Sequence, residues 1–308
     1  MRYMIFVFLG ACSYGVLSTF VKFAYEDGYI VNEVTGSQMF YGMITAWILV
    51  LLFSRQRASL RQWLVMLGVG VSLGSTGVLY YASLQFVPAS IGIVLMFQFT
   101  WIGVLIDAGR KRQWPSKDKQ LALLLLLAGT VMAGGVLDGG GAWEFSLVGV
   151  LLGLASAFTY ALFILFNETA AVELNPWIRG AIISTGSMLV SSVVFPPEFI
   201  FNGKLLEGTL TQWGILLAIF GIVVPTLFFA IGVPRIGGDL ATILGAAELP
   251  TAVLLSSLVL HEQVTPLQWI GVVVILVGIV IPQVADRFRR TTTPATQPSQ
   301  SVKTTDLT

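Results

Sequence analysis

The sequence predicts an all-α integral membrane protein with ten transmembrane helices. Hydrophobic residues make up 56% of its 308 residues, charged residues only 11%, and the mean hydropathy is +0.84. An ordinary soluble domain has about 25% charged residues, so this composition excludes a disordered chain or a nucleic-acid-binding protein and argues against a soluble enzyme. The apolar runs at 121–137 and 270–281 are long and do not alternate. They therefore predict membrane helices and not the strands of an outer-membrane barrel.

A membrane helix needs about 20 mainly apolar residues, and the chain is long enough for ten of them with short connections. Charge clusters, glycines and prolines mark the breaks between them. The predicted spans are residues 3–24, 33–53, 63–84, 89–107, 120–137, 145–167, 177–197, 211–233, 239–260 and 267–284. The segment 285–308 is rich in Thr, Ser, Pro and Gln and is predicted to be a disordered cytoplasmic tail.

The basic residues predict the orientation of these spans. With both termini in the cytoplasm, every Lys and Arg except Lys22 and Lys204 falls on the cytoplasmic side. Positively charged loops are retained on that side of a membrane during insertion. The sequence therefore predicts a multi-pass protein of the cytoplasmic membrane with N- and C-termini inside. The basic loop 110–119 suits this topology and anionic lipid headgroups far better than nucleic acid.

The two halves of the chain resemble each other in the same order. The matching segments are 10–13 with 153–156, 79–82 with 227–230, and Pro115 and Gly129 with Pro266 and Gly278. Five spans in each half make the second half enter the membrane from the opposite face, so the halves form an inverted-topology repeat. Residues 1–144 are the first predicted repeat and 145–284 the second. Such repeats recur in transporters, with the binding site near the middle of the bilayer.

The second half carries a recognisable pattern. Glu248, Leu249 and Pro250 are followed by LHEQVT at 260–265, QWIG at 268–271 and Gly278. With ten spans and two halves, this pattern resembles the EamA-like members of the drug/metabolite transporter superfamily. The first half departs from it, because Thr100 occupies the place of the matching proline and a basic loop follows the fourth span. The resemblance implies transport of small metabolites or amphipathic compounds, often outward.

Cysteine and histidine are scarce, which limits the chemistry available. Cys12 and His261 are the single residues of their types, so no internal disulfide, thiolate metal cluster or histidine dyad can form. The chain also lacks the GxxxxGK[ST] motif of ATP-binding loops. We therefore expect no catalytic residues, no metal and no cofactor, and we expect that the protein is not an enzyme.

Glu248 is the principal candidate for a functional residue. It lies in the middle of the ninth predicted span, where a carboxylate costs several kcal/mol unless it faces a cavity or a partner. Three roles are open: proton exchange during transport, binding of a cationic substrate group, or an interhelical hydrogen bond of purely structural importance. The repeat matches Glu248 with Gln98, and Trp101 lies three residues further on the same helix face. These three residues are predicted to form a small pocket, although Trp101 is equally suited to simple packing.

Further polar and aromatic residues lie within the predicted spans. Ser156 and Tyr160 share one helix face, and the repeat matches Ser13, which is followed by Tyr14, with Ser156. Tyr80 belongs to the segment that matches 227–230. These residues are candidates for lining a cavity or for helix-packing hydrogen bonds. Pro225 and Pro250 interrupt the eighth and ninth spans and are predicted hinges or helix breaks.

Taken together, these features predict a secondary transporter of small organic solutes that works by alternating access. Its expected partners are a small-molecule substrate, the lipid bilayer and, where Glu248 titrates, protons. Export is favoured over import by the family resemblance alone. Two alternatives are kept: a facilitator without ion coupling, and a non-transporting partner subunit or sensor.

Overall fold

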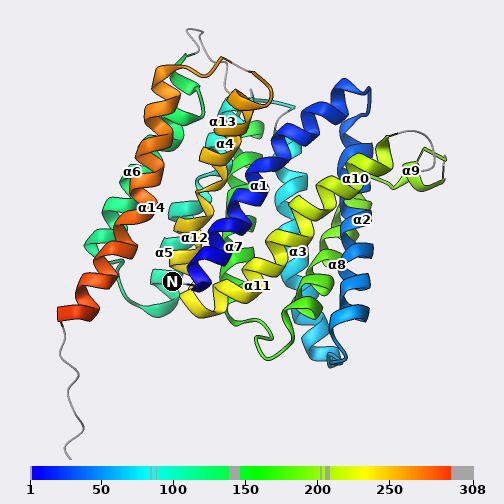
Figure 1. Ribbon diagram of the computed structural model, residues 1–308, viewed down its shortest axis with the longest axis horizontal. Coiled ribbons are helices and arrows are strands. Elements are labelled where there is room, and N and C mark those ends of the chain that lie inside the picture. The colour runs from blue at the N-terminus through cyan, green and yellow to red at the C-terminus, as the bar shows by residue number, and fades with distance from the viewer. Residues whose placement is uncertain are drawn as a thin grey trace, which may run out of the picture.

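The computed structural model describes residues 2–83, 85–87, 89–138, 146–201, 203–204, 209–261 and 263–292. These residues form helices and the turns between them, with no strand in any of the described ranges (Figure 1). The helices are α1 (Arg2–Glu26), α2 (Val31–Phe53), α3 (Leu60–Ser83), α4 (Ala89–Met96), α5 (Phe99–Lys111), α6 (Lys117–Ala133), η1 (Val136–Asp138), α7 (Leu147–Thr169), α8 (Pro176–Val194), α9 (Glu198–Phe201), α10 (Leu210–Ala218), η2 (Ile219–Val223), α11 (Val224–Ile236), α12 (Gly238–Gly245), α13 (Glu248–Leu258) and α14 (Pro266–Thr292).

Eight helical stretches within the described residues are long and apolar enough to cross a membrane. They are α1, α2, α3, the stretch Ile91–Lys111, α7, α8, the stretch Leu210–Ile236 and the stretch Gly238–Leu258. The predicted all-α membrane class is therefore confirmed. Helix α6 has 17 residues, and the apolar part of α14 is Pro266–Pro282. Both are shorter than these eight stretches, so the count of ten crossings stays a prediction.

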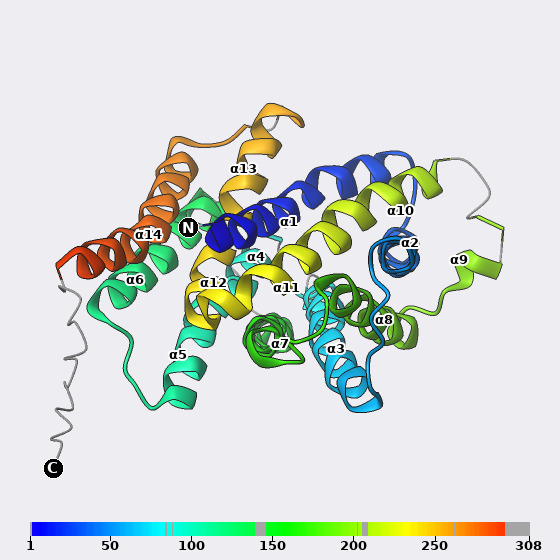
Figure 2. The ribbon, with the colours of Figure 1, turned by 60° about the horizontal axis from the view of Figure 1, so that its bottom comes forward.

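Most of the helices pack against one another in pairs. Helix α1 runs beside α10 and α11, while α6 and α14 lie against each other at one side of the molecule (Figures 1 and 2). At the other side, α8 packs against α2 and α3, and α7 contacts α3, α5 and α11. Side chains such as Leu51 and Val193, 81% and 82% exposed, cover the outer surface. In a bilayer this surface meets acyl chains, so its exposure carries no penalty.

Two of these helix pairs depend on glycines where the backbones meet. A methyl carbon at Gly70 of α3 would lie 2.2 Å from the carbonyl oxygen of Ile183 in α8. At the α6–α14 contact, a methyl carbon at Gly271 would lie 2.4 Å from the backbone nitrogen of Ala133. Any larger side chain would force these helices apart. Small residues at such contacts are typical of membrane helices, which associate through close packing and not through a hydrophobic driving force.

The first residues of the predicted tail are helical. Residues 285–292 continue α14, which ends at Thr292. Alanine and arginine are good helix formers, and basic residues are favourable at a helix C-terminus because they face its negative dipole end. The rest of the expected tail, residues 293–308, lies outside the described residues.

A buried arginine joins three of the helices. Arg179 is 1% exposed, and its Nη1 donates a hydrogen bond of 2.6 Å to the carbonyl oxygen of Ala230 in α11. That carbonyl has lost its helical donor, because the residue four positions later is Pro234, which has no N–H. Arg179 Nη2 also donates to the carbonyl oxygen and to Oδ1 of Asn167, both at 2.6 Å, near the end of α7. One guanidinium therefore satisfies carbonyls that the helices leave open.

Because Arg179 binds the carbonyl that Pro234 leaves free, we predict that substitutions at these two residues have coupled effects on the free energy of unfolding. Replacing Arg179 with Leu removes charged hydrogen bonds and is expected to lower the free energy of unfolding by about 3–5 kcal/mol. In a Pro234→Ala background the Ala230 carbonyl regains its helical donor, so the same replacement should cost about 1–2 kcal/mol less. Chemical denaturation in detergent micelles measures all four corners of this double-mutant cycle. Pro282→Ala in α14 is the matched control background. If it reduced the cost of Arg179→Leu as much as Pro234→Ala does, the proposed coupling would be contradicted.

Candidate functional site

The described residues enclose a cavity of about 610 Å³ between α1, α2, α3, α7 and α13. Its deep end is lined by Glu248, Tyr14 and Tyr160. It extends to the surface at Asn32 and Gln85, which are both exposed and lie at the start of α2 and just after α3. The cavity therefore opens at one end of the helix bundle and is closed at the other.

Two broken helices shape the deep end. Helices α4 and α5 meet at a tight turn where the N–H of Gln98 bonds to the carbonyl oxygen of Leu95 at 3.2 Å. Helices α12 and α13 meet at a similar turn, with a 3.1 Å bond from the N–H of Ala247 to Leu244. The second turn makes Glu248 the first residue of α13, where the helix dipole favours a negative charge.

The carboxylate of Glu248 shares the cavity with five tyrosines, including Tyr25 and Tyr81. Tyr14, Tyr80 and Tyr160 all line it, and the rings of Tyr14 and Tyr160 meet edge to face with centroids 6.2 Å apart. The hydroxyl groups of Tyr14 and Tyr160 are buried and have no hydrogen-bond partner among the described residues. Burying a hydroxyl group without a hydrogen-bond partner costs free energy, unless water or a ligand supplies the missing hydrogen bond. The deep end of the cavity is therefore suited to a polar group brought by a bound solute.

An aromatic layer closes the deep end. The ring of Tyr160 packs against Phe99 with centroids 4.6 Å apart and stacks on Phe163 at 6.0 Å. Phe163 in turn stacks on Phe229 of α11 at 6.0 Å. Phe99, Phe163 and Phe229 are fully buried. Because Phe163 lies one turn beyond Tyr160 along α7, this layer separates the cavity from the far end of the bundle.

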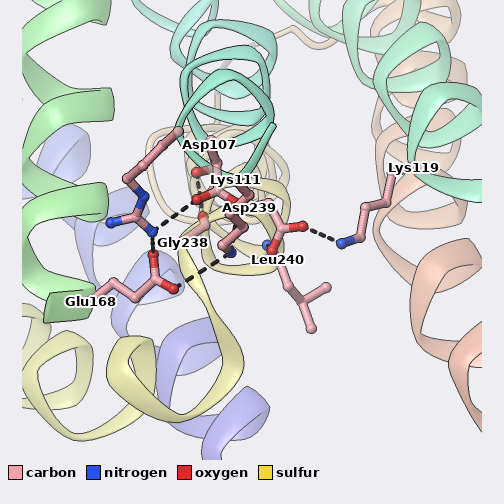
Figure 3. Close-up of polar contacts among 9 residues, drawn as sticks. Asp107, Lys111, Lys119, Glu168, Gly238, Asp239 and Leu240 are labelled. Atoms are coloured by element: carbon pink, nitrogen blue, oxygen red, sulfur yellow. Dashed lines mark hydrogen bonds and ion pairs between the residues drawn. The ribbon is translucent and has the colours of Figure 1, made fainter. Parts of the chain in front are cut away.

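An ion cluster lies beyond the aromatic layer, at the end of the bundle opposite the cavity mouth. Asp107 of α5, only 2% exposed, binds Arg110 at 2.9 Å and Lys111 at 2.7 Å. Both cations also bind Glu168 at the end of α7, the Lys111 pair measuring 3.5 Å. Figure 3 shows Lys119 reaching from α6 to Asp239 of α12. We call these six residues, Asp107, Arg110, Lys111, Lys119, Glu168 and Asp239, the ion cluster. It joins α5 and α6 to α7 and α12.

This pairing changes the interpretation of the basic loop. The sequence favours lipid headgroups as partners for the loop 110–119, whereas three of its cations bind carboxylates of the protein itself. Glu168 and Asp239 come from distant parts of the chain, so sequence spacing could not pair them with these cations. Asp107 lies three and four residues before Arg110 and Lys111, a spacing that does pair charges on one helix face. The signal available was their position, because Asp107, Glu168 and Asp239 all lie at or near the ends of predicted spans on the basic side.

Of the residues predicted to bind substrate or protons, four line the cavity together and four do not. Glu248, Tyr14, Tyr80 and Tyr160 line it, whereas Gln98, Trp101, Ser13 and Ser156 are not among its lining residues. The expected pocket of Glu248, Gln98 and Trp101 therefore does not form. Trp101 Nε1 donates to Gln98 Oε1 at 2.7 Å, and Gln98 Nε2 donates to the carbonyl oxygen of Val94 at 2.7 Å. The side chains of Gln98 and Trp101 therefore form their hydrogen bonds within their own helical stretch.

The two serines make structural hydrogen bonds, and the two prolines lie in the first turns of α11 and α13. Ser156 donates to the carbonyl oxygen of Gly153 at 2.7 Å. Ser13 donates to the carbonyl oxygen of Phe220 at 2.6 Å. That carbonyl lacks a donor of its own, because Val224 N–H bonds to Ile219 in the π-helical segment η2 and Pro225 has no N–H. Pro250 is the third residue of α13, so the helix break precedes it at residues 246–247.

Sequence reasoning missed several polar residues of the cavity wall. Thr35 and Gln38 of α2 and Thr76 of α3 line the cavity and are buried within their helices. The signal was present, since polar residues inside an apolar span face protein and not lipid. Gln38 in particular stands in a stretch where an amide facing lipid would be costly. Glu262, another carboxylate of the second half, lies outside the described residues.

Comparisons with known proteins agree on the kind of molecule. A sequence profile of the EamA-like transporter family matches residues 1–135 and 147–282. A Synechocystis protein named an uncharacterized transporter (sll1319) is 29% identical over 66% of this chain, which spans 61% of that protein. The threonine/homoserine exporter RhtA of Escherichia coli K12 is 26% identical, over 70% of this chain and 69% of its own.

A solved crystal structure shares the fold. It superposes with a TM-score of 0.75 at 15% sequence identity, covering 92% of this chain and 99% of the other. At that identity the likeness concerns the arrangement of the helices alone.

The closed end of the cavity predicts a difference in chemical access. In a Cys12→Ser background, Tyr80→Cys places a thiol on the cavity wall and Phe163→Cys places one in the aromatic layer. A water-soluble thiosulfonate reagent is expected to modify the first rapidly and the second slowly, because water reaches only the cavity wall. Mass spectrometry of intact protein measures both rates. Equal rates would mean that the aromatic layer does not close the cavity.

Proposed function

Because the chain belongs to the EamA-like transporter family, we propose that it is a secondary transporter that moves small organic metabolites or amphipathic compounds by alternating access. Family membership makes it a membrane transporter and not an enzyme. One observation supports the finer proposal most strongly. The cavity that holds Glu248 is open at one end of the bundle and closed at the other by the aromatic layer and the ion cluster.

We propose two five-helix repeats of inverted topology, residues 1–144 and 145–284. The family profile matches once in each half, at 1–135 and 147–282, and each half contains one helix that is broken at a tight turn. In this arrangement the α4–α5 and α12–α13 breaks are equivalent features of the two repeats. Broken helices near a central site are a recurrent transporter feature, because their free ends can contact the transported solute.

Our proposal for the orientation rests on charge. The segments 55–61 and 110–119, around the loops that join α2 to α3 and α5 to α6, carry eight of the 13 basic residues outside the tail. Placing these segments in the cytoplasm satisfies the positive-inside rule and puts both termini on the cytoplasmic side of the membrane. The cavity mouth at Asn32 and Gln85 then faces outward and the ion cluster faces inward. We therefore interpret the structure as an outward-open state.

Export is the direction that we propose, with an amino-acid-like solute as the first probe. The E. coli relative is named as an exporter of threonine and homoserine. These solutes carry an ammonium group, which the Glu248 carboxylate is suited to bind. We further propose that Glu248 exchanges this group for a proton, so that an inward proton gradient drives efflux. A facilitator without ion coupling would use the same cavity but would ignore the gradient.

Removing the carboxylate of Glu248 tests this coupling. Glu248→Gln is expected to lower pH-gradient-driven flux of threonine or homoserine in proteoliposomes by at least about tenfold, since a charged hydrogen bond is lost. Exchange of solute for solute, which needs no net proton movement, should fall less. Glu26→Gln, an exposed glutamate outside the cavity, is the matched control.

The outcomes of this assay separate the alternatives. Unchanged gradient-driven flux in Glu248→Gln would exclude proton exchange at this residue, and flux that ignores pH in the native protein would identify a facilitator. The absence of flux for any solute from a thermal-shift screen, together with co-purification of a second protein, would favour a partner subunit.

Breaking the ion cluster tests the proposed inner gate. Asp107→Asn weakens two pairs whose cations are 37% and 41% exposed, so each contributes no more than about 1 kcal/mol. The inward-open population should then rise by roughly 5–30-fold. Access of a thiol reagent to Phe163→Cys from the cytoplasmic face of oriented vesicles measures this shift. Asp118→Asn, the same change outside the ion cluster, should leave access unaltered. Equal access in the two variants would contradict the gate.

A further inference from the structure

A second depression, of about 760 Å³, lies between α3 and α7 at the end of the bundle opposite the cavity mouth. We call it the α3–α7 groove. Its polar end is lined by Ser59, Arg61, Gln62 and Glu173, and its apolar end by Val65, Gly68, Val69 and Phe166. No step of the proposed transport cycle uses it.

Hydrogen bonds hold the side chains at the polar end of the groove in place. The N–H of Ser59 donates to Gln62 Oε1 at 2.8 Å, and the N–H of Gln62 donates to Ser59 Oγ at 3.4 Å, which together cap the start of α3. Gln62 Nε2 also donates to Glu173 Oε1 at 2.7 Å. This hydrogen bond is the main reason why the pKa of the Glu173 carboxyl is lowered. Glu173 is therefore held in place as an anion.

The one cation that lines the groove, Arg61, has no partner among the described residues. Arg61 lies in the first turn of α3 and makes no hydrogen bond or ion pair with any described residue. It is exposed at the groove, next to the positive end of a 24-residue helix. Backbone N–H groups and a guanidinium at such an end are the groups that bind phosphate in many proteins.

The apolar end continues from this charged region along the same helix. Val65 and Phe166 are each 45% exposed. A methyl carbon at Gly68 would meet nothing within 4 Å, so the wall between them is hollow. From Ser59 to Val69 the groove follows α3 for about 15 Å, at 1.5 Å per residue. This length covers the headgroup layer, which is roughly 5–8 Å deep on each side of the bilayer, and the first part of the hydrocarbon core.

We propose that the α3–α7 groove binds a phospholipid with an ammonium headgroup, phosphatidylethanolamine. Its phosphate binds Arg61 at the start of α3, its ammonium donates to Glu173, and one acyl chain lies over Gly68 between Val65 and Phe166. The two charges of this headgroup match the opposite charges of Arg61 and Glu173. Phosphatidylglycerol lacks a cation for Glu173, and the trimethylammonium of phosphatidylcholine has no N–H to donate.

Native mass spectrometry tests this site with the intact protein. Protein from nanodiscs containing equal phosphatidylethanolamine, phosphatidylcholine and phosphatidylglycerol is released into detergent, and the retained lipids are counted. The native chain is expected to retain one phosphatidylethanolamine in preference to the other two. Arg61→Gln should reduce this retention by at least about fivefold, because the phosphate loses its charged donors. Arg57→Gln, which changes an exposed arginine of the loop before α3 and outside the groove, is the matched control.

Two further variants separate the parts of the proposal. Glu173→Gln should keep phospholipid bound but abolish the preference for ethanolamine over choline, since both phosphates still meet Arg61. Gly68→Leu fills the groove and should displace the lipid without changing any charge. Equal loss in the Arg57 and Arg61 variants, or an unchanged preference in Glu173→Gln, would overturn the proposal. Because the readout is bound lipid, the result is independent of whether the protein transports the solutes proposed above.

Discussion

The need to satisfy every backbone carbonyl inside the bilayer governs how the helices of this protein meet. Water is absent there, so a carbonyl without a donor must find one in the protein. Pro225 and Pro234 free the carbonyls of Phe220 and Ala230, and Ser13 and Arg179 donate to them. These bonds tie α1 and α8 to the helices η2 and α11. The first of them also fixes the turn of α1 that brings Tyr14, the next residue, to the cavity.

Two acidic residues inside the protein, Asp107 and Glu248, are stabilised in different ways. Asp107 is almost fully buried, and two cations of its own helix neutralise it. Glu248 stands at the start of α13, keeps part of its surface open to the cavity, and faces tyrosine hydroxyls that have no partner. The first arrangement is complete within the protein and holds helices together. The second is incomplete, so a solute or proton can change its free energy, which is what a transport site requires.

The sequence was sufficient for the all-helical membrane class, and half of the residues that it singled out for substrate or proton binding line the cavity. Apolar length alone marks a membrane helix, and a glutamate or tyrosine within one faces protein, so Glu248, Tyr14, Tyr80 and Tyr160 could be predicted. Ser13, Gln98, Trp101 and Ser156 carry the same signal, but their polar atoms are satisfied by neighbours. Distinguishing the two groups requires knowing which helix lies beside each residue. For Ser13 it also requires the π-helical segment that frees the Phe220 carbonyl.

The two barriers below the cavity differ in the free energy needed to open them. The aromatic layer of Phe99, Phe163 and Phe229 is fully buried and packs like a core. Separating it loses contacts that water does not replace. The pairs of the ion cluster are partly exposed on the cation side, and water compensates for most of what their separation loses. The ion cluster is therefore suited to select which helices move together. In the transport cycle that we propose, the aromatic layer sets the height of the barrier, because the rings of α5, α7 and α11 must separate before a solute can pass.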